Sequence, residues 1–427
     1  MQLKISNVGK IEKATIDING LTVIAGENNA GKSTIGKTLF SIFNSMNNMG
    51  EKIEQERENR VKSIVNRTLQ GKISHDATYT TSRRRTIVST TRLLSEMFMD
   101  YWNSESTQKL SDLIKEPISQ SSLFESQQDE NEFVSECEEK IEELFAISDK
   151  KVMMEVITRW FDRVFENQIS PLREETAESK VELLIKEKKV LFTFRENICV
   201  DWNSDVNILH EAFYIDNPFV LDYLAGYDSS SRLVESHLIE YLEKEEKDIY
   251  NNLFDAVVAK DKLGEIDKIL GEVVKGDIEE NQNGEYYFKS DKNIKPLNIV
   301  NLSTGLKSFA LIKHLLKSGC IKEKDVLILD EPEVHLHPEW QLLYAKLIVL
   351  LQKEFDLSMI ITTHSPYFLD AIDVFSKKYD VFPGPCYYLA ENVGETSTLH
   401  DVSDNIDAIY KKLSEPMQLL ENLRYNS

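Results

Sequence analysis

Cysteine is scarce in this sequence, and it shows none of the spacings that metal sites or disulfide frameworks use. The four cysteines lie far apart, and no Cys-x-x-Cys pair occurs: Cys137, Cys199, Cys320 and Cys386. This distribution argues against a thiolate zinc site and against a disulfide-stabilised scaffold, and it is typical of a reducing compartment. We therefore expect a cytoplasmic protein.

Long apolar runs are also missing. The first ten residues, MQLKISNVGK, lack the apolar stretch of a signal peptide. The longest apolar run, around 342–351, contains Lys346 and is too short to span a bilayer. We expect no membrane partner.

Positive charge is in short supply overall, but it is not evenly distributed. The formal net charge is −22, so the chain as a whole should repel nucleic acid. Residues 57–92, however, contain nine Lys or Arg and two acids, whereas residues 125–143 contain nine acids and one lysine. One interpretation is a basic arm whose candidate DNA contacts are Arg83, Arg84 and Arg85. The other is that both segments are solvated helix faces.

Glycine is absent between positions 72 and 225, in a region rich in Glu, Lys, Gln and Ser. This composition, from about residue 46 to 190, predicts helices, and Pro117 and Pro171 divide them. Apolar residues do not sustain a heptad repeat there, which disfavours a long coiled coil. We expect a large helical insertion.

The two ends of the chain show the patterns of an α/β fold. Short apolar or alternating runs predict strands at 3–8, 14–18, 21–25, 189–200, 212–215, 285–288, 326–329 and 359–361. The continuous apolar runs at 326–329 and 359–361 are typical of buried parallel strands, with a crossover helix at 339–355 between them. Residues 404–424 are expected to form a C-terminal amphipathic helix.

The stretch GENNAGKST, Gly26–Thr34, matches the phosphate-loop pattern G-x-x-x-x-G-K-[ST]. It follows an apolar strand and precedes a helical pattern, which is the context that this motif requires. The two glycines allow backbone N–H groups to converge on a phosphate at a helix N-terminus. Lys32 would reach the β- and γ-phosphates, and the Ser33 hydroxyl would bind Mg²⁺. The predicted nucleotide-binding residues are Gly26, Glu27, Asn28, Asn29, Ala30, Gly31, Lys32, Ser33 and Thr34.

A second motif begins where the apolar run 326–329 meets Asp330 and Glu331. Because Glu333, His335 and His337 follow at alternate positions, a transition-metal site is one interpretation. In the presence of a phosphate loop, a different interpretation is stronger. Asp330 would hold Mg²⁺ and Glu331 would act as the general base that activates water.

Two further segments have a structural and a functional interpretation. His364 follows the apolar strand 359–361, where it could contact the γ-phosphate or simply make a structural hydrogen bond. Ser303 precedes a helical pattern and could be an N-cap, yet a Ser-x-Gly sequence with Gly305 at a helix start also forms an anion site. Ligands of open α/β sheets bind at the carboxyl ends of strands, so these groups can converge.

Taken together, four stretches resemble the ABC-type ATPases of the SMC/RecF/OLD-like branch, and most closely the PtuA-like anti-phage ATPases of Septu and retron systems. The stretches are NVGKIEKATIDINGLTVIAGENNAGKST, NLSTGLKS, VLILDEPEVHLHPEWQ and ITTHSPYFL. The resemblance implies an α/β ABC-ATPase head, with a mixed sheet that has a parallel core and N-terminal antiparallel strands, and with a large, mainly helical insertion.

The resemblance also implies an arrangement of domains. We expect an N-terminal lobe with the phosphate loop at 1–45, a helical insertion at 46–190 and a lobe of strands and helices at 191–298. The C-terminal lobe of the head would span 299–400, and a C-terminal helix 401–427.

ATP and Mg²⁺ are the cofactors that the resemblance implies, in a homodimer with two composite sites. Lys32, Ser33, Asp330, Glu331 and His364 of one subunit would face Ser303 and Gly305 of the other across ATP. His335 and His337 then occupy the D-loop position at the dimer seam rather than a metal site. Asp216–Asn217 is a weak candidate for the Q-loop.

Only about 60 residues follow His364, too few for the nuclease domain of OLD-type proteins. The resemblance therefore implies a separate effector, such as an HNH nuclease, controlled by an ATP-driven dimeric switch in an anti-phage system. The alternative is a DNA-repair ATPase of RecF/SMC type that binds DNA directly. A transporter subunit fits the long insertion and the EPEVHLHP stretch least well.

Overall fold

The computed structural model describes residues 1–72, 81–104, 126–171, 177–224, 232–243, 263–282, 284–291 and 295–425, with a few single positions between 105 and 125. The chain divides into two compact units. The first, here called the head unit, consists of residues 1–47 and 157–427, and the second, the helical unit, consists of residues 48–156.

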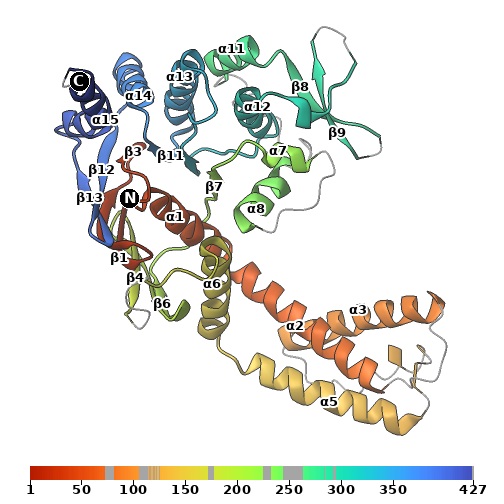
Figure 1. Ribbon diagram of the computed structural model, residues 1–427. Coiled ribbons are helices and arrows are strands. Elements are labelled where there is room, and N and C mark those ends of the chain that lie inside the picture. Colours follow the sequence, from red (N-terminus) through yellow and green to blue (C-terminus); the bar gives the residue numbers. More distant parts are fainter. Residues whose placement is uncertain are drawn as a thin grey trace. The chain divides into compact units, whose positions relative to one another are not determined.

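The head unit is built on a mixed sheet of eleven strands (Figure 1) in the order β6-β5-β4-β1-β2-β13-β12-β3-β11-β10-β7. Its parallel part consists of β12 (Cys386–Val393), β3 (Leu21–Gly26), β11 (Ser358–Thr363), β10 (Val326–Asp330) and β7 (Ala212–Ile215). The rest contains the antiparallel pairs that involve β1 (Gln2–Val8), β2 (Ile11–Asp17), β4 (Ser179–Ile185), β5 (Lys188–Arg195), β6 (Ile198–Ser204) and β13 (Thr396–Asp401). The predicted α/β class, with a parallel core and antiparallel N-terminal strands, is confirmed.

The register of the central strands brings three loops to one edge of the sheet. Thr363 of β11 pairs with Ala25 of β3, and Asp330 of β10 pairs with Thr362 of β11. Since these strands are parallel, the loops that follow β3, β10 and β11 begin side by side. The strand order therefore brings together segments that lie more than 300 residues apart.

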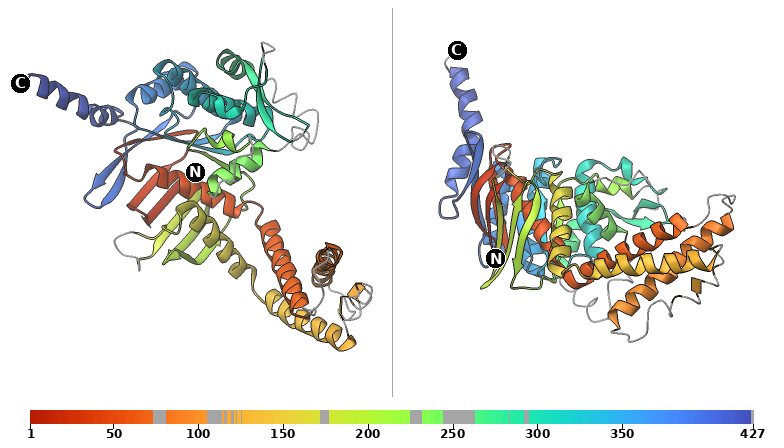
Figure 2. Two further views of the ribbon diagram at one scale, coloured as in Figure 1. Left: turned by 45° about the vertical axis from the view of Figure 1, so that its right-hand side comes forward. Right: turned by 90° about the horizontal axis from the view of Figure 1, so that it is seen from below.

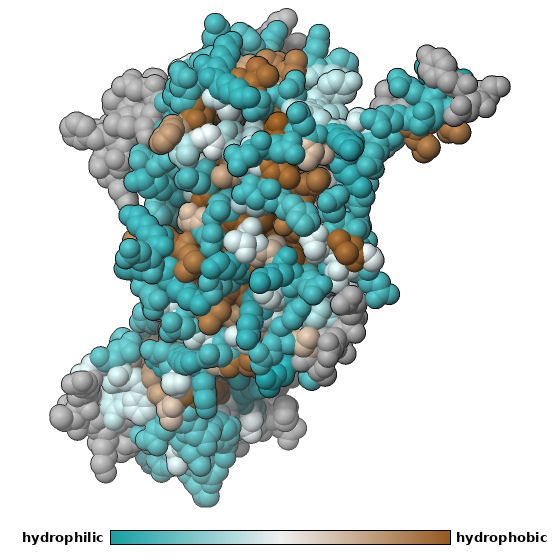
Figure 3. Space-filling view, turned by 90° about the vertical axis from the view of Figure 1, so that its left-hand side faces the viewer, coloured by the Kyte–Doolittle hydropathy of each residue, from teal (hydrophilic) through white to brown (hydrophobic). Residues whose placement is uncertain are grey.

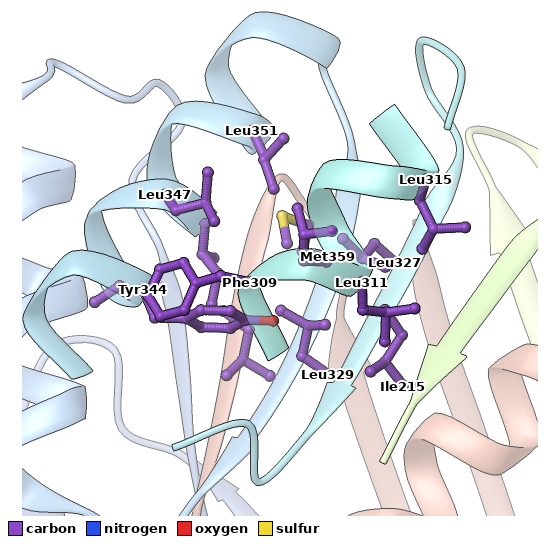
Figure 4. Packing of buried hydrophobic residues seen from close by; sticks show 14 of the residues in the cluster. Ile215, Phe309, Leu311, Leu315, Leu327, Leu329, Tyr344, Leu347, Leu351 and Met359 are labelled. Atoms are coloured by element: carbon purple, nitrogen blue, oxygen red, sulfur yellow. The ribbon is translucent and has the colours of Figure 1, made fainter. Parts of the chain in front are cut away.

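Helices cover both faces of this parallel core because its strands are apolar on both sides. Leu327 and Leu329 of β10 face the layer formed by α12 (Thr304–Lys317), α13 (Pro338–Phe355) and α14 (Pro366–Lys378), as Figure 4 shows for part of this core. Ile328 faces the opposite side, where α1 (Lys32–Met46) packs. A Cβ atom on Gly36 of α1 would lie 2.7 Å from Ile328 Cγ2, so glycine allows the helix to approach the sheet closely.

The helical unit contains α2 (Met49–Lys72), α3 (Thr81–Asn103) and α5 (Gln127–Phe145). Their apolar faces form a separate core from Val61, Val65, Leu69, Leu94, Phe98, Phe133, Cys137 and Ile141. Part of the positive charge in 57–92 is paired within this unit. Lys72 Nζ lies 2.7 Å from Glu132 Oε2, and Arg57 Nη2 lies 2.6 Å from Asp149 Oδ1 at the start of α6 (Asp149–Phe165).

The structure differs from two sequence-based expectations in this region. The helical unit ends at Val156 rather than near residue 190, and β4 joins the sheet of the head unit. Strand β4 was not predicted, because its alternating charged residues Lys180 and Glu182 make its sequence resemble a polar helix segment. The single strand expected at 189–200 is a hairpin of β5 and β6, because Glu196 and Asn197 form a tight turn with φ of 51° and 66°.

The remaining elements lie in the second half of the chain. They are α7 (Val220–Tyr223), α8 (Leu233–Leu242), α11 (Gly264–Val273), a hairpin of β8 (Gly276–Glu280) and β9 (Tyr286–Ser290), a 3₁₀ turn at Ile299–Asn301, and α15 (Asp407–Tyr425). Among the described helices, none combines the length and the apolar composition that crossing a bilayer requires.

The C-terminal helix α15 is attached to the head unit by its first half. Ile409 is fully buried in the core, whereas Leu419, Leu420 and Leu423 are 61%, 57% and 62% exposed. Both views of Figure 2 show the last turns of α15 extending beyond the sheet, and Figure 3 shows apolar side chains gathered on them. These turns therefore contribute little to the core of the head unit.

Candidate nucleotide site

The phosphate loop connects the end of β3 to the start of α1, as the sequence predicts. Gly26 has φ of 146° and Gly31 has φ of 77°. A Cβ atom at Gly26 would lie 2.0 Å from Ala390 O, and one at Gly31 would lie 2.7 Å from Ile11 Cγ1. Both positions require glycine for two reasons, the backbone conformation and the lack of space.

The loop is closed on itself by main-chain and side-chain hydrogen bonds. The Lys32 ammonium donates to Gly26 O at 3.3 Å and to Glu27 O at 2.9 Å, and its side chain is only 5% exposed. Thr34 N donates to Gly31 O at 3.1 Å, which forms the first turn of α1. The lysine is thus held inside the loop that would surround a phosphate.

Residues from outside the motif hold the outer side of the loop. Lys10 Nζ donates to Asn29 O at 3.0 Å, and Asn392 Nδ2 donates to Asn28 O at 3.3 Å. Ala30 is buried at 1% exposure. The β1–β2 turn and strand β12 therefore support the backbone of the loop.

Glu27 connects the loop to the C-terminal helix. Its carboxylate lies 2.9 Å from Lys412 Nζ of α15 and accepts a hydrogen bond from Asn392 Nδ2 at 2.8 Å. The hydrogen bond from Lys412, and then those from Asn392, lower the pKa of Glu27 to about 2. Glu27 is thus ionised at neutral pH, and its carboxylate is engaged by Lys412 and Asn392.

Asp330, at the end of β10, is held on both of its carboxylate oxygens. The buried Tyr214 hydroxyl of β7 donates to Asp330 Oδ2 at 2.6 Å, and Thr362 Oγ1 of β11 donates to Oδ1. Burial, and then the nearby Asp330 carboxylate, raise the pKa of Tyr214 well above its ordinary value, so the phenol stays a donor. Each oxygen keeps a further lone pair for a cation.

Glu331, His364 and Lys32 form one cluster. Glu331 has φ of 52°, and its backbone N–H donates to Thr362 O at 3.1 Å and Thr362 Oγ1 at 3.0 Å. This conformation brings Glu331 Oε1 to 3.2 Å from His364 Nδ1 and to 3.6 Å from Lys32 Nζ. Three residues separated by up to 332 positions in the sequence therefore meet at one point.

A cavity of about 260 Å³ lies beside this cluster. Its lining includes Ser33 of the phosphate loop, Asp330, Glu331 and the candidate Q-loop residues Asp216 and Asn217. A serine hydroxyl and a carboxylate at one cavity are the oxygen ligands that Mg²⁺ prefers, so the residues present fit that ion. Ser33 and Asp330 would hold it, at the wall of a space that can accept phosphate groups.

Ser303 and Gly305 are not brought to this cavity. Ser303 is the N-cap residue of α12, as one interpretation expected, but its exposed side chain makes no capping hydrogen bond. Gly305 lies against Trp340 and His335, where a Cβ atom would be 3.0 Å from Trp340 Cε3 and 3.3 Å from His335 O. Among the described residues, no hydrogen bond or ion pair joins Ser303 or Gly305 to the phosphate loop.

The alternating residues after Glu331 diverge. Glu333 is buried at 2% exposure and accepts hydrogen bonds from Thr363 and from His364 N, whereas the exposed His335 ring lies 5.9 Å from the Phe219 ring. His337 is exposed at the start of α13. In the part of the chain that the structure describes, no three His, Cys, Asp or Glu residues gather to hold a metal ion.

The candidate DNA contacts lie on α3 of the helical unit. Arg84 and Arg85 are exposed, and the side chain of Arg83 lies outside the described residues. Their role stays a prediction.

Sequence reasoning did not find four residues that organise the site: Tyr214, Asn392, Lys412 and, in its actual role, Glu333. The strand that contains Tyr214 was predicted, but the pairing of β7 with β10 was not. Glu333 was noticed only as a candidate metal ligand. No local signal identifies Asn392 or Lys412, because their partners lie 365 and 385 positions earlier in the chain.

Comparison with known proteins identifies a matching family and related proteins. A family model described as "AAA domain, putative AbiEii toxin, Type IV TA system" matches residues 21–370. The Septu protein PtuA of Bacillus thuringiensis is 31% identical over 225 residues, which cover 43% of this chain and 53% of that protein. The retron Ec83 probable ATPase of Escherichia coli is 36% identical over 94 residues, 19% of this chain and 17% of that protein.

The chain thus spans about half of the length of the first curated relative and about a sixth of the second. Among solved structures, an SMC head bound to the C-winged helix domain of ScpA covers 95% of this chain and 98% of its own, with 12% identity and a TM-score of 0.40. The SMC head domain from Thermotoga maritima covers 94% and 98%, with 11% identity and a TM-score of 0.37. The curated relatives confirm the resemblance to defence ATPases that the motifs predict.

Proposed function

The chain belongs to the family of AAA-domain ATPases matched over residues 21–370, and on that premise we propose that it is an ATP-hydrolysing switch that works as a head-to-head homodimer. The cluster of Lys32, Glu331 and His364 beside the cavity carries this proposal. A carboxylate within reach of a lysine and an imidazole is suited to activate water next to a terminal phosphate.

Each residue has a defined task in this proposal. Lys32 leaves the carbonyl oxygens of Gly26 and Glu27 to contact the β- and γ-phosphates, which then occupy the loop. Mg²⁺, held by Ser33 and Asp330, would neutralise charge on the same phosphates. Glu331 accepts a proton from the attacking water. His364, at 3.2 Å from Glu331 Oε1, orients that carboxylate and contacts the γ-phosphate.

The segment NLSTGLKS, which contains Ser303 and Gly305, supports the proposal of a dimer. Ser303 has a free helix N-terminus behind it and an exposed hydroxyl that makes no capping bond. Such a helix end attracts an anion. We infer that Ser303 and Gly305 of one subunit complete the site of the other across ATP, so that nucleotide occupancy controls dimerisation.

We further propose that this switch is the ATPase component of an anti-phage system and controls a separate effector, such as an HNH nuclease. The relationship to a Septu protein and to a retron ATPase supports this role. Co-purification of the chain with the products of its neighbouring genes, with and without ATP, tests it. An effector that is retained only in one nucleotide state is the expected result.

The test of the ATPase compares the parent with Glu331→Gln and Lys32→Ala, using phosphate release and molar mass in solution. Glu331→Gln should abolish turnover and accumulate an ATP-bound dimer, whereas Lys32→Ala should lose nucleotide binding. Glu272→Gln, which alters an exposed carboxylate of α11, is the matched control and should behave as the parent. Unchanged turnover and mass in Glu331→Gln would contradict the assignment.

The exposed Arg84 and Arg85 favour a second candidate, an ATPase that binds DNA directly. Neutralising Arg83, Arg84 and Arg85 together should then weaken DNA binding and reduce the slope of log K against log salt by up to about 3. An unchanged slope would leave the protein effector as the target of the switch.

A further inference from the structure

Glu333 is a carboxyl group buried in the turn that follows Glu331. Only 2% of its side chain is exposed. Burial of an ionised carboxylate is unfavourable unless cations or several donors compensate, and burial raises the pKa of Glu333 above its ordinary value. Among the described residues, no cation forms an ion pair with it, and its Oε2 atom accepts no hydrogen bond. Stability alone therefore gives little reason for an acid at this position.

The contacts of the other oxygen all lead to the turn between β11 and α14. Glu333 Oε1 accepts from Thr363 Oγ1 at 2.5 Å and from His364 N at 3.2 Å. Thr363 Oγ1 in turn accepts from Ser365 N at 3.0 Å. Gln341 of α13 closes the network, because its side chain donates to Glu333 O at 3.4 Å and accepts from Ser365 Oγ at 3.2 Å.

This network connects the same two residues whose side chains meet at the cavity. Glu331 and His364 touch directly, through Oε1 and Nδ1 at 3.2 Å. Glu333 adds a second connection, since it lies two residues after Glu331 and holds the backbone amide of His364. The relative position of the carboxylate and the imidazole is therefore determined twice, through the side chains and through the backbone.

We propose that Glu333 is a positioning residue, which holds His364 in place against Glu331 for the chemical step. The inference rests on the ATPase function proposed for this site. Glu333 does not line the cavity, and no hydrogen bond or ion pair among the described residues joins it to Lys32, which contacts Gly26 O, Glu27 O and Glu331 Oε1. Loss of Glu333 should thus affect turnover and leave nucleotide binding intact.

The kinetic test uses Glu333→Ala, Glu333→Gln, His364→Ala and the double variant Glu333→Ala/His364→Ala. A displacement of about 1 Å in a catalytic group can cost about 100-fold in rate, so Glu333→Ala should lower kcat about 10- to 100-fold with KM unchanged within about threefold. Glu333→Gln should stay close to the parent, because the amide oxygen accepts the same two hydrogen bonds. In the His364→Ala background, Glu333→Ala should change kcat less than about twofold, since its effect passes through His364.

Thr363→Val provides a second route to the same contact if Glu333→Ala does not fold. It removes the hydroxyl that donates to Glu333 Oε1 while keeping the shape of a buried side chain. It should lower kcat with the same dependence on His364. The proposal would be overturned if the losses in kcat multiplied when His364→Ala was combined with either variant, or if KM rose in parallel. Parent-like turnover in both Glu333→Ala and Thr363→Val would also overturn it.

Hydrogen exchange separates this inference from the ATPase assignment. The amide of His364 should exchange at least about 10-fold faster in Glu333→Ala than in the parent, and Glu333→Gln should keep the parent rate, because the amide donates to Glu333 Oε1. This measurement does not require turnover. A parent without ATPase activity but with this exchange pattern would refute the function and keep the contact, whereas an active parent with unchanged exchange in Glu333→Ala would refute the role of Glu333.

Discussion

The hydrogen bond between Tyr214 and Asp330 makes a demanding test of the metal assignment. Tyr214 is 1% exposed, and its hydroxyl lies 2.6 Å from Asp330 Oδ2, with Thr362 on the other oxygen. Tyr214→Phe removes one hydroxyl and keeps the ring, so it creates no large cavity. It leaves the carboxylate with one of its two side-chain donors.

The expected loss of stability in Tyr214→Phe follows from the type of hydrogen bond that is removed. A buried hydrogen bond to a charged group contributes about 1.5–3 kcal/mol, so the free energy of unfolding without Mg²⁺ should fall by about that amount. Removing a group that orients a metal ligand typically costs about 10- to 100-fold in metal affinity. The Mg²⁺ concentration that gives half-maximal ATP hydrolysis should rise accordingly, with little change in kcat at saturating Mg²⁺.

The assays are urea unfolding and ATP hydrolysis over a Mg²⁺ titration. Tyr388→Phe is the matched control, because Tyr388 is also buried, at 1% exposure, does not line the cavity, and has a hydroxyl that accepts a hydrogen bond between neutral groups, from Asp17 N at 2.8 Å. It should shift neither quantity as far. If Tyr214→Phe loses stability but keeps the Mg²⁺ requirement within about twofold, Asp330 does not bind the metal in the way we infer.

Three other predictions concern the loop and the fold. Gly31→Ala should abolish nucleotide binding in an equilibrium titration while most of the fold persists, since φ of 77° and the contact with Ile11 exclude a side chain. Lys412→Met should raise the pKa of Glu27 from about 2 toward its ordinary value, which an NMR titration can measure. In the parent, this carboxylate stabilises the fold above about pH 4.5, and the stabilisation is lost as the pH falls toward 2. Burial raises the pKa of Asp325 to about 6, so its contribution to stability is greatest below about pH 4 and is lost as the pH rises through 6. The difference in unfolding free energy between the parent and Asp325→Asn should therefore change by at most about 3 kcal/mol between pH 4 and 7. Urea unfolding at the two pH values measures it.

Much of the nucleotide site was predictable because its motifs are local. Gly26, Gly31 and Lys32 lie within one strand-loop-helix segment, where backbone conformation and the helix start follow from a few neighbouring residues. The apolar run before Asp330 and the one before His364 also identified buried strands without tertiary information. Boundaries were harder where a strand carries charge on one face, as β4 does with Lys180 and Glu182.

The sequence by itself determined the phosphate loop, the acid pair, the parallel strands and the polar helical insertion, because periodicity and glycine positions act over a few residues. Only the tertiary structure decided which groups support them. Tyr214 meets Asp330, and Lys412 meets Glu27, because the sheet order places β7 beside β10 and brings α15 back to the loop after β3. Such contacts depend on how distant strands and helices pack together, so no local pattern of residues predicts them.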